Sequence, residues 1–284
     1  MKKKIAVTGA SGQLGSEIRS IWPSDDAYHL IFLDRDDLPL DDVENIYARL
    51  AGYDPDVIIH SGAYTAVDLA ESESDLADKV NNRASREIAK VARDCSAKLI
   101  YISTDYVFPG DVPHPLTEDQ VTAPINAYGL SKLKGEKGIQ DILPDSIIIR
   151  TSWLYSIFGK NFVKTMLNLM AIRESINVVN DQLGSPTSAK DLAKAIQHII
   201  RSEKWQAGIY HYSNEGEATW FDFAIKIREL SASACVVNPV DSKFFPTVAK
   251  RPKYSLLNKQ KIKSTFQLEI PHWEDSLKEM LGGR

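Results

Sequence analysis

The sequence predicts an α/β fold in which a Rossmann-type, doubly wound parallel sheet is joined to a smaller mixed α/β lobe. Three observations predict it. Over the first 150 residues, short apolar segments alternate with longer amphipathic ones, as in successive βαβ units. The apolar segments mostly lack strict alternation, which is typical of strands buried on both faces. A glycine-rich turn, GASGQLG, directly follows the first of these segments.

Five segments rich in Val, Ile, Leu or Tyr are the expected strands of the sheet: residues 5–8, 30–33, 57–60, 98–103 and 146–150. Amphipathic patterns between them predict helices at 13–20, 43–50, about 76–94 and 127–141. After residue 153 the alternation loosens, and proline- and glycine-bearing segments separate the helical patterns at 162–173, 189–201, 221–230 and 276–281. These patterns predict a second, more irregular lobe.

The composition excludes several classes of protein. The 284 residues are 43% hydrophobic and 25% charged, as in globular proteins. The formal net charge is −4 and the basic residues are scattered, so nucleic acid is not an expected partner. Cys95 and Cys235 lie far apart, which favours neither a disulfide framework nor a zinc site. No apolar run approaches the ~20 residues that span a bilayer, and no signal-peptide pattern begins the chain, so we expect a cytoplasmic protein that does not bind membranes.

The segment KKIAVTGASGQLGSEI connects an expected strand to an expected helix through Gly9, Gly12 and Gly15. Glycines there allow a tight turn and a close approach to a pyrophosphate, which the free N–H groups of the first helical turn attract. Asp34 follows ~20 residues later, where a carboxylate can accept hydrogen bonds from both adenosine ribose hydroxyls. Arg35 beside it could offset the repulsion of a 2′-phosphate, so NADPH and NADH both stay possible. An ordinary turn and an Asp that only ends a strand are the alternatives.

These signals divide the chain into two parts. We expect residues 1–153, with a return of about 184–205, to form a dinucleotide-binding domain. Residues 154–183 and 206–284 would form a substrate-binding lobe.

Tyr128 and Lys132, in the segment INAYGLSK, are four residues apart and would share one face of a helix. The spacing alone carries little weight, because roughly one such pair is expected by chance. A neighbouring ammonium would lower the pKa of the phenol from about 10 and so favour proton exchange. In STDYVF, Thr104 is the expected second donor to a ketone oxygen, with Ser103 as the fallback. A hydroxyl that caps a loop is the alternative for Thr104.

Further sequence blocks run through the chain: GAYTAVDLAE (62–71), ISTDYVFPG (102–110), PLTEDQVTAPINAYG (115–129), RTSWLY (150–155), GKNFVKTML (159–167), DQLGSPT (181–187) and RPKYSLLN (251–258). Together with VTGASGQLG and YGLSK, they make nearly the whole chain similar to the extended short-chain dehydrogenase/reductase family. Several blocks are peculiar to its branch of dTDP-sugar ketoreductases. The resemblance implies an oxidoreductase of dTDP-rhamnose and polysaccharide biosynthesis. It would reduce the C4 ketone of dTDP-4-dehydro-L-rhamnose to dTDP-L-rhamnose by hydride transfer from NADPH or NADH.

By this resemblance Tyr128 would donate the proton, Thr104 would polarise the carbonyl, and Lys132 would also hold the nicotinamide ribose. The expected cofactor contacts are Gly9, Ser11, Gly12, Gln13, Leu14, Asp34, Arg35, Leu40, Ala63, Tyr64, Thr65, Tyr128 and Lys132. The expected contacts of the sugar nucleotide are Thr104, Asp105, Tyr106, Phe108, Trp153 and Arg251, the last as a partner of the diphosphate.

Three positions depart from the pattern of this branch. His60 and Ser61 stand where its members usually have a small polar or alanine pair, which would affect packing under the cofactor. Pro39 stands where members often have Asp, which would leave Leu40 alone to contact the adenine.

Metal and oligomer also follow from the resemblance. Some members bind magnesium through glutamates at a dimer interface; Glu17 matches one of these positions, but Lys190 falls near another. We therefore expect no metal-bridged dimer and no metal site, whereas a homodimer of another kind stays possible.

Other functions of the same fold remain as alternatives. A related nucleotide-sugar reductase or epimerase would keep the fold and change the sugar or the reaction. A dehydratase is disfavoured because no glutamate follows Asp105. A non-catalytic NADP-binding regulatory subunit is disfavoured by the joint presence of Thr104, Tyr128 and Lys132. The preferred dinucleotide and the stereochemistry of the product stay open.

Overall fold

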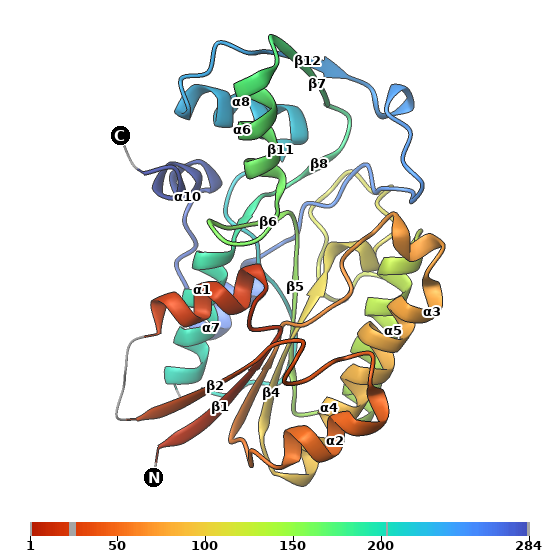
Figure 1. The fold of residues 1–284 in the computed structure, drawn as a ribbon, viewed down its shortest axis with the longest axis vertical. Coiled ribbons are helices and arrows are strands. Elements are labelled where there is room, and N and C mark those ends of the chain that lie inside the picture. Colours follow the sequence, from red (N-terminus) through yellow and green to blue (C-terminus); the bar gives the residue numbers. More distant parts are fainter. Residues whose placement is uncertain (1, 23–26, 203, 283–284) are drawn as a thin grey trace.

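The computed structural model describes residues 2–22, 27–202 and 204–282 (Figure 1). In this part of the chain, six parallel strands form one sheet in the order β10-β5-β4-β3-β1-β2. The strands are β1 (Lys3–Thr8), β2 (Tyr28–Leu33), β3 (Val57–His60), β4 (Lys98–Thr104), β5 (Ile147–Thr151) and β10 (Gly208–His211). The predicted Rossmann-type parallel sheet is confirmed.

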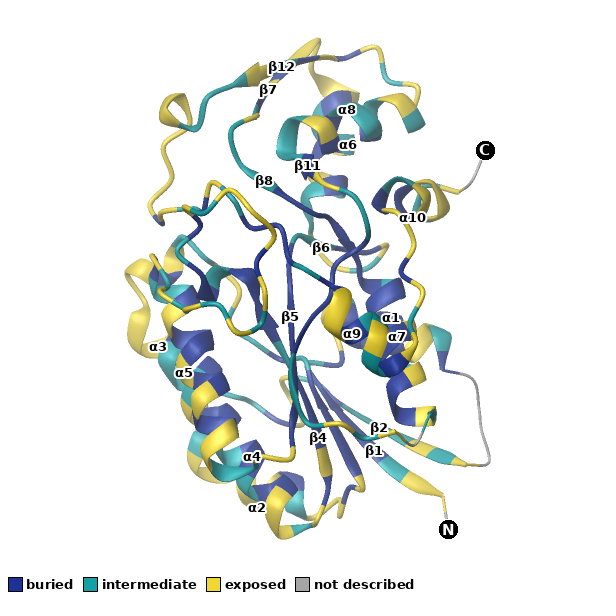
Figure 2. Ribbon diagram, turned by 180° about the vertical axis from the view of Figure 1, so that it is seen from behind, coloured by how far each residue is buried: buried dark blue, intermediate teal, exposed yellow. Residues whose placement is uncertain are grey.

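Helices cover both faces of this sheet (Figure 1). One face carries α1 (Gln13–Ile21), α7 (Ala189–Arg201) and α9 (Gln260–Phe266). The other face carries α2 (Val43–Ala51), α4 (Ala84–Asp94) and α5 (Ala127–Ile142). This two-sided covering explains why the central strands are buried along most of their length (Figure 2).

Successive side chains of β1 show how the two layers form. Ile5 and Val7 join the core beneath α1 and α7, whereas Ala6 between them joins the core beneath α2 and α4. All three are fully buried. Burying an Ile or Val side chain contributes about 1.5–3 kcal/mol, so a polar residue at either site would weaken the attachment of a whole helical layer.

The order of the strands reverses at β1. The chain passes from β1 outward to β2 and then returns to β3 on the opposite side of β1. The loops that follow β1 and β3 therefore separate at this point, which is where open α/β sheets bind ligands. Gly9 and Gly62 lie there back to back: Gly9 has φ +67°, and a Cβ on it would lie 2.6 Å from the Gly62 Cα.

The smaller lobe has its own core. Three helices, α6 (Phe162–Ile172), α8 (Trp220–Leu230) and α10 (Trp273–Met280), surround buried side chains that include Val163, Phe223 and Leu277. The lobe also contains three short strand pairs: β7 (Ser175–Val179) with β12 (Val236–Val240), β8 (Leu183–Gly184) with β11 (Ala218–Thr219), and β6 (Leu154–Tyr155) with β9 (Thr187–Ser188). The predicted mixed α/β lobe is thus observed.

Three features differ from the expected elements. The expected helix at 76–94 consists of α3 (Ser74–Asp78), a π-helical turn (Lys79–Arg83) and α4. Strand β10 pairs with β5, and α9 packs on the core of the sheet, although both lie in the range assigned to the lobe. That assignment was wrong for these elements, because their apolar side chains complete the sheet domain. The rest of the division stays a prediction, and its residues 1, 23–26, 203, 283 and 284 lie outside the described residues.

The short helical turns are Leu69–Glu71, Asp105–Val107 and Ser242–Phe244. Within the described ranges, none of the helices combines the length and the apolar character needed to cross a membrane.

Candidate active site

A cleft of about 980 Å³ opens where the strands of the sheet end, between the sheet and the smaller lobe. This volume is at the upper end of the range for small-molecule sites. The loops after β1, β2, β3, β4 and β5 all contribute to its lining, and the smaller lobe adds Trp220 and Arg251. All the predicted site residues line this cleft except Phe108.

The glycine-rich turn forms one end of the cleft. A Cβ on Gly15 would lie 2.5 Å from the Gly9 carbonyl oxygen, and a Cβ on Gly12 would lie 3.1 Å from the same atom. Gly12 is the N-cap of α1, and no side chain hydrogen-bonds to the N–H groups of this helix end. These groups can therefore bind an anion. The residues present fit the pyrophosphate of a dinucleotide.

Asp34 and Arg35 lie beyond the turn, at the end of β2. One carboxylate oxygen of Asp34 accepts the backbone N–H of Asp36 at 3.0 Å, which fixes the orientation of the carboxylate. Leu40 lines the same part of the cleft, and its side chain occupies the space in front of Gly62. This end of the cleft therefore offers a carboxylate, a guanidinium and an apolar side chain.

The loop after β3 carries Ala63, Tyr64 and Thr65 along the cleft. Asn81, in the π-helical turn, holds this loop: its side chain accepts the Tyr64 N–H at 2.8 Å and donates to the Tyr64 carbonyl at 3.0 Å. The Tyr64 hydroxyl donates to Glu73 at 2.6 Å, and this bond raises the pKa of Tyr64 to about 12. Asn81 was not among the predicted site residues, because no local pattern marks it.

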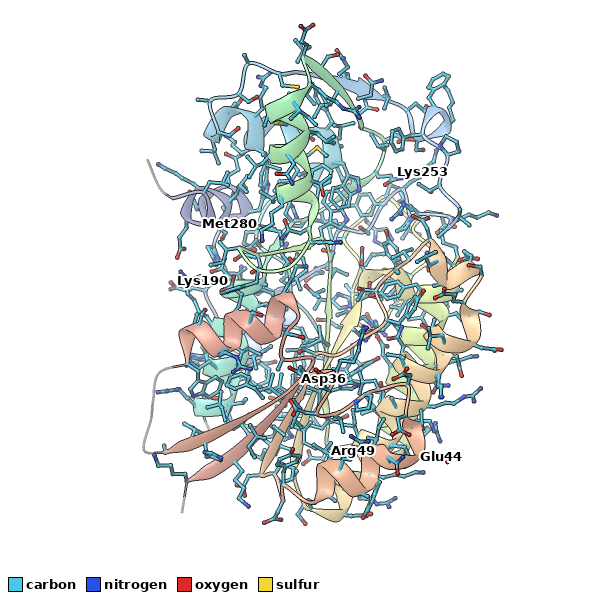
Figure 3. All side chains as sticks on the ribbon, viewed as in Figure 1. Asp36, Glu44, Arg49, Lys190, Lys253 and Met280 are labelled. Atoms are coloured by element: carbon cyan, nitrogen blue, oxygen red, sulfur yellow. The ribbon has the colours of Figure 1, made fainter. Side chains whose placement is uncertain are left out.

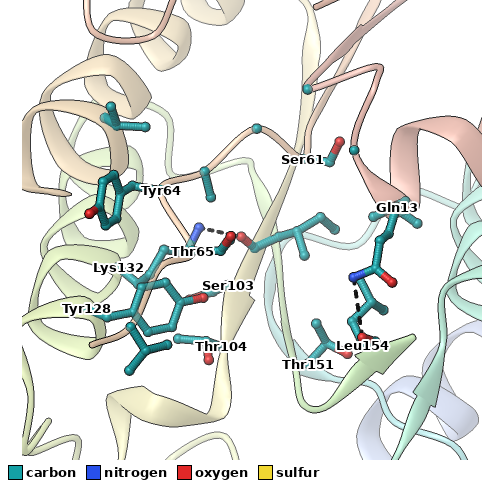
Figure 4. A pocket seen from close by; sticks show the side chains of 18 of the residues that line it. Gln13, Ser61, Tyr64, Thr65, Ser103, Thr104, Tyr128, Lys132, Thr151 and Leu154 are labelled. Atoms are coloured by element: carbon teal, nitrogen blue, oxygen red, sulfur yellow. Dashed lines mark hydrogen bonds between the residues drawn. The ribbon is translucent and has the colours of Figure 1, made fainter. Parts of the chain in front are cut away.

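Helix α5 brings Tyr128 to the end of β4. The helix begins at Asn126, whose side chain accepts the Gly129 N–H at 2.8 Å. A Cβ on Gly129 would collide with the Tyr106 carbonyl oxygen, so glycine is required for this close approach. As a result the Tyr128 hydroxyl points toward Ser103 and Thr104 (Figure 4).

The pKa of Tyr128 shifts in the direction opposite to the predicted one. Burial raises the pKa of this phenol, and hydrogen bonding with Thr104 opposes the rise. The ammonium of Lys132 donates instead to the Ile102 carbonyl at 2.7 Å (Figure 4). Lys132 is 2% exposed, and its burial lowers its own pKa to about 7. The prediction of a phenol acidified by its lysine neighbour was wrong, because it left out the desolvation of both groups.

Thr104 and Asp105 form a buried pair beside Tyr128. The Thr104 hydroxyl donates to one Asp105 oxygen at 2.9 Å and accepts the Tyr106 N–H at 3.2 Å. Burial raises the pKa of Asp105 to about 6. The Ser103 hydroxyl is buried without a hydrogen-bond partner in the described part of the chain, whereas hydrogen bonding with Ser255 opposes the rise in the pKa of Asp105. The unpartnered Ser103 hydroxyl can therefore hydrogen-bond to a polar ligand in the cleft.

The opposite wall of the cleft is aromatic. Trp153 has φ +48°, a conformation that costs a bulky residue about 1–3 kcal/mol. Its ring stacks on Trp220 with centroids 3.6 Å apart and planes 10° apart. Arg251 donates to Asp68 at 2.7 Å and to the Tyr106 hydroxyl at 3.1 Å, which holds its guanidinium at the cleft. This strained, well-packed wall indicates a second binding region, distinct from the glycine-rich turn.

Comparisons with known proteins place this cleft in a family. The family model for the RmlD substrate binding domain matches residues 3–283. The dTDP-4-dehydrorhamnose reductase of Escherichia coli (strain K12) is 41% identical over 247 residues, which are 84% of this chain and 83% of the relative. The chain belongs to the dTDP-4-dehydrorhamnose reductase family. The spore coat polysaccharide biosynthesis protein SpsK of Bacillus subtilis (strain 168) is 38% identical and covers 99% of this chain, with 98% of its own length matched.

Solved structures agree with this membership in the dTDP-4-dehydrorhamnose reductase family. The dTDP-4-dehydrorhamnose reductase of Bacillus anthracis str. Ames, solved in complex with NADP, is similar with a TM-score of 0.94 and 40% identity over 99% of both chains. The resemblance drawn from the sequence blocks is confirmed. The UDP-glucuronic acid 4-epimerase of Bacillus cereus has a TM-score of 0.84 at 19% identity, so it shares the fold alone.

Phe108 does not line the cleft of this family member. Its side chain is fully buried in a cluster with Val107, Leu116 and Leu257, and its ring lies edge-on to His211. The predicted substrate contact was therefore wrong. In a turn the direction of a side chain depends on tertiary packing, which the segment STDYVF does not reveal.

Several lining residues of the cleft were not predicted. They are Leu38, Asp41, Gly62, Val67, Leu76, Val80, Ile102, Thr151, Ser152, Leu154, Gly159, Lys160 and Trp220. Gly159 and Lys160 lie within the block GKNFVKTML, which supplied a signal that was not used. No local sequence pattern marks Trp220 as a site residue, because its place at the cleft depends on tertiary packing, which stacks its ring on Trp153.

The residues that depart from the reductase pattern lie beneath and beside the cleft. His60 is fully buried; its Nδ1 lies 2.7 Å from the Thr8 hydroxyl and its Nε2 lies 3.0 Å from the Ser85 hydroxyl. Burial lowers the pKa of His60 to about 3, so this ring is neutral at pH 7. The Ser61 hydroxyl donates to the Thr8 carbonyl at 2.7 Å. Both departures are accommodated by hydrogen bonds, to β1 from both residues and to α4 from His60.

Glu17 and Lys190, which bear on the metal question, both have protein partners. Glu17 is buried and accepts the Ser156 hydroxyl at 2.6 Å. Lys190 lies on the outer side of α7 in Figure 3 and pairs with Glu279 at 2.8 Å. No group of three or more potential metal ligands occurs among the residues that the structure describes.

Proposed function

We propose that this protein reduces the C4 ketone of dTDP-4-dehydro-L-rhamnose to dTDP-L-rhamnose with NADPH or NADH. One observation carries the proposal: the hydroxyls of Tyr128 and Thr104 meet in the cleft that also holds Lys132 and the glycine-rich turn. Family membership supports the substrate, since the relative from Escherichia coli is named dTDP-4-dehydrorhamnose reductase. The NADP in the related structure from Bacillus anthracis supports the cofactor.

A reduced nicotinamide, when bound, supplies the hydride. Tyr128 then donates its proton to the oxygen that becomes the sugar hydroxyl. A pKa raised by burial suits this role, because the phenol stays protonated at neutral pH until the alkoxide forms. An alkoxide is a much stronger base than a phenolate, so the transfer remains downhill.

Thr104 and Lys132 support this proton transfer. The Thr104 hydroxyl has a single proton, which it donates to Asp105 at 2.9 Å in this structure; to polarise the ketone it would turn this O–H from Asp105 to the ketone oxygen. The Lys132 ammonium stabilises the negative charge that Tyr128 acquires when it loses its proton. With a pKa of about 7, Lys132 is partly protonated at neutral pH, so the solution pH controls this stabilisation.

The cleft would bind its two ligands in separate regions, the dinucleotide in one and the sugar nucleotide in the other. The turn from Gly9 to Leu14 would hold the pyrophosphate, and Asp34 with Arg35 would hold the adenosine ribose. Ala63, Tyr64 and Thr65 would flank the dinucleotide, with Leu40 against its adenine. The sugar nucleotide would lie against Asp105, Tyr106, Trp153 and Arg251. The cytoplasmic location and the homodimer stay predictions.

Tyr128→Phe tests the proposal, because it removes the proton donor and keeps the ring. We expect kcat to fall by about 10²–10⁴-fold and the Kd of NADPH to stay unchanged. The assay follows the loss of reduced-nicotinamide absorbance with freshly made dTDP-4-dehydrorhamnose.

Tyr106→Phe is the matched control for this test, since the Tyr106 ring lies 5.7 Å from that of Tyr128 and its hydroxyl contacts Arg251. This variant should raise KM and keep kcat. An unchanged kcat in Tyr128→Phe would contradict the assigned role. If the unaltered protein does not oxidise NADPH with this substrate but does so with another nucleotide ketose, the proposed substrate is wrong.

A further inference from the structure

The cleft contains a cationic side chain to which the proposed function gives no role. Lys160 lies in the loop between β6 and α6 of the smaller lobe, and it lines the cleft next to Gly159 and Gln13. The side chain is exposed. Within the described residues it has no ion pair and no side-chain hydrogen bond. It is therefore available to a ligand.

The loop that carries Lys160 is attached to α1 by three side-chain hydrogen bonds. Asn161 donates to the Gln13 side-chain oxygen at 3.0 Å. Gln13 in turn donates to the Leu154 carbonyl at 3.4 Å (Figure 4). The Ser156 hydroxyl donates to the buried Glu17 carboxylate at 2.6 Å. Residues 154–161 thus follow the first two turns of α1, although they belong to the other lobe.

Gly159 allows the backbone before Lys160 to pass close to the side chain of Gln13. It has φ +64°, and a Cβ on it would lie 3.1 Å from the Cγ of Gln13. Gln13 is the first residue of α1, directly after the N-cap Gly12. Lys160 therefore leaves the loop beside the N-terminus of α1, where the free N–H groups already favour an anion.

Two other cations of the cleft already have partners within the protein. Lys132 is buried and donates to the Ile102 carbonyl, and Arg251 is paired with Asp68. Arg35 follows Asp34 at the adenosine end. Among the cations that line the cleft in the described part of the chain, Lys160 lies in the loop that packs on Gln13 at the start of α1, through Gly159 and Asn161. A pyrophosphate carries two negative charges, and the partial charge of one helix end does not balance them.

We infer that Lys160 binds the pyrophosphate of the dinucleotide together with the α1 N–H groups. A residue of the smaller lobe would then complete the cofactor site of the sheet domain, so binding of the dinucleotide would hold the two parts together. This inference rests on the proposed function only in that the cofactor is a dinucleotide. The group that Lys160 would bind is a diphosphate diester, and the sugar nucleotide also contains such a group.

The test compares Lys160→Met, Lys160→Arg and Lys137→Met in the full chain. Lys137 is an exposed lysine on α5 that does not line the cleft, so its variant controls for the loss of one positive charge. The Kd of NADPH is measured from its fluorescence without sugar nucleotide, and the Kd of dTDP is measured by calorimetry. Circular dichroism checks that each variant is folded, which we expect because both lysines are exposed.

We expect Lys160→Met to raise the Kd of NADPH on the order of 10-fold, as for the loss of a charged hydrogen bond. Lys160→Arg should restore most of the affinity, and Lys137→Met should leave it unchanged. The Kd should also depend less on salt in Lys160→Met than in the unaltered protein, because an exposed charge pair is screened.

Two results would overturn the inference. One is an unchanged Kd of NADPH in Lys160→Met. The other is a Kd of dTDP that rises in Lys160→Met while the Kd of NADPH stays unchanged. That result would show that Lys160 binds the sugar nucleotide and not the dinucleotide. Turnover of dTDP-4-dehydrorhamnose by the unaltered protein is scored separately. A protein that binds NADPH through Lys160 and does not reduce this sugar would refute the proposed function alone.

Discussion

Helix α5 buries two charged groups one turn apart, and their surroundings differ. Glu136 forms two hydrogen bonds with Arg150, at 2.9 and 2.7 Å, and both side chains are almost fully buried. Lys132 is equally buried, but its ammonium donates to the neutral Ile102 carbonyl and lies 4.0 Å from the ring centroid of Tyr101. Among the described residues it has no carboxylate partner within ion-pair distance.

The difference separates a structural charge from a reactive one. The two-point pairing of Arg150 with Glu136 compensates both charges and leaves neither free for a ligand. Burial without a paired counter-charge lowers the pKa of Lys132 to about 7. Near this pH the charge of Lys132 responds to small changes in its surroundings. Burial thus has opposite consequences on one helix, depending on whether a counter-charge is present.

Replacing Lys132 should give the largest effect. Lys132→Met removes the cation that stabilises the phenolate, so we expect turnover to fall by about 10²–10⁴-fold and the Kd of NADPH to rise. Stability should not fall, because an uncompensated buried charge is removed. Steady-state kinetics and urea unfolding measure the two effects. A variant that unfolds more easily but keeps its turnover would assign Lys132 a structural role.

Breaking the paired charges should act on stability instead. Arg150→Met leaves the Glu136 carboxylate buried without a partner, and we expect the free energy of unfolding to fall by about 3–5 kcal/mol. The double variant Arg150→Met with Glu136→Leu should recover much of this loss, since neither charge remains. Urea unfolding of the single and double variants measures both. A loss below about 1 kcal/mol in the single variant would show that the pair is not needed.

The smallest effect, taken over one pH unit, is the pH dependence of stability that comes from Lys132. Its pKa is about 7 in the folded protein and 10.5 by the ordinary value, so between these limits the unfolded chain binds more protons. Stability should therefore rise from pH 7 toward 10.5 through this group, by at most about 1.4 kcal/mol per pH unit. The difference between the unaltered protein and Lys132→Met isolates this contribution. Parallel stability curves from pH 6 to 9 would contradict the lowered pKa.

Local patterns predicted the parts of the molecule that are determined locally. The glycine spacing identified the turn after β1, and continuous apolar segments identified five strands of the sheet. Strand β10 was missed because only its pairing with β5 makes residues 208–211 part of the sheet. The direction of the Tyr128 pKa was missed because desolvation depends on what the fold packs around the hydroxyl. Asn81 was missed for a similar reason, since its partners Tyr64 and Ser131 are distant in sequence.

The contact between Gly9 and Gly62 limits which side chains the chain can carry at these two positions. Two backbones touch there with no side chain between them, so β1 and β3 cannot come closer at the base of the cleft. A larger residue at Gly9 would therefore force apart the loops that follow β1 and β3. Gly62 differs, because a Cβ on it would first meet the Leu40 side chain at 2.7 Å, which can move; a substitution at Gly9 should therefore destabilise the fold more than the same substitution at Gly62.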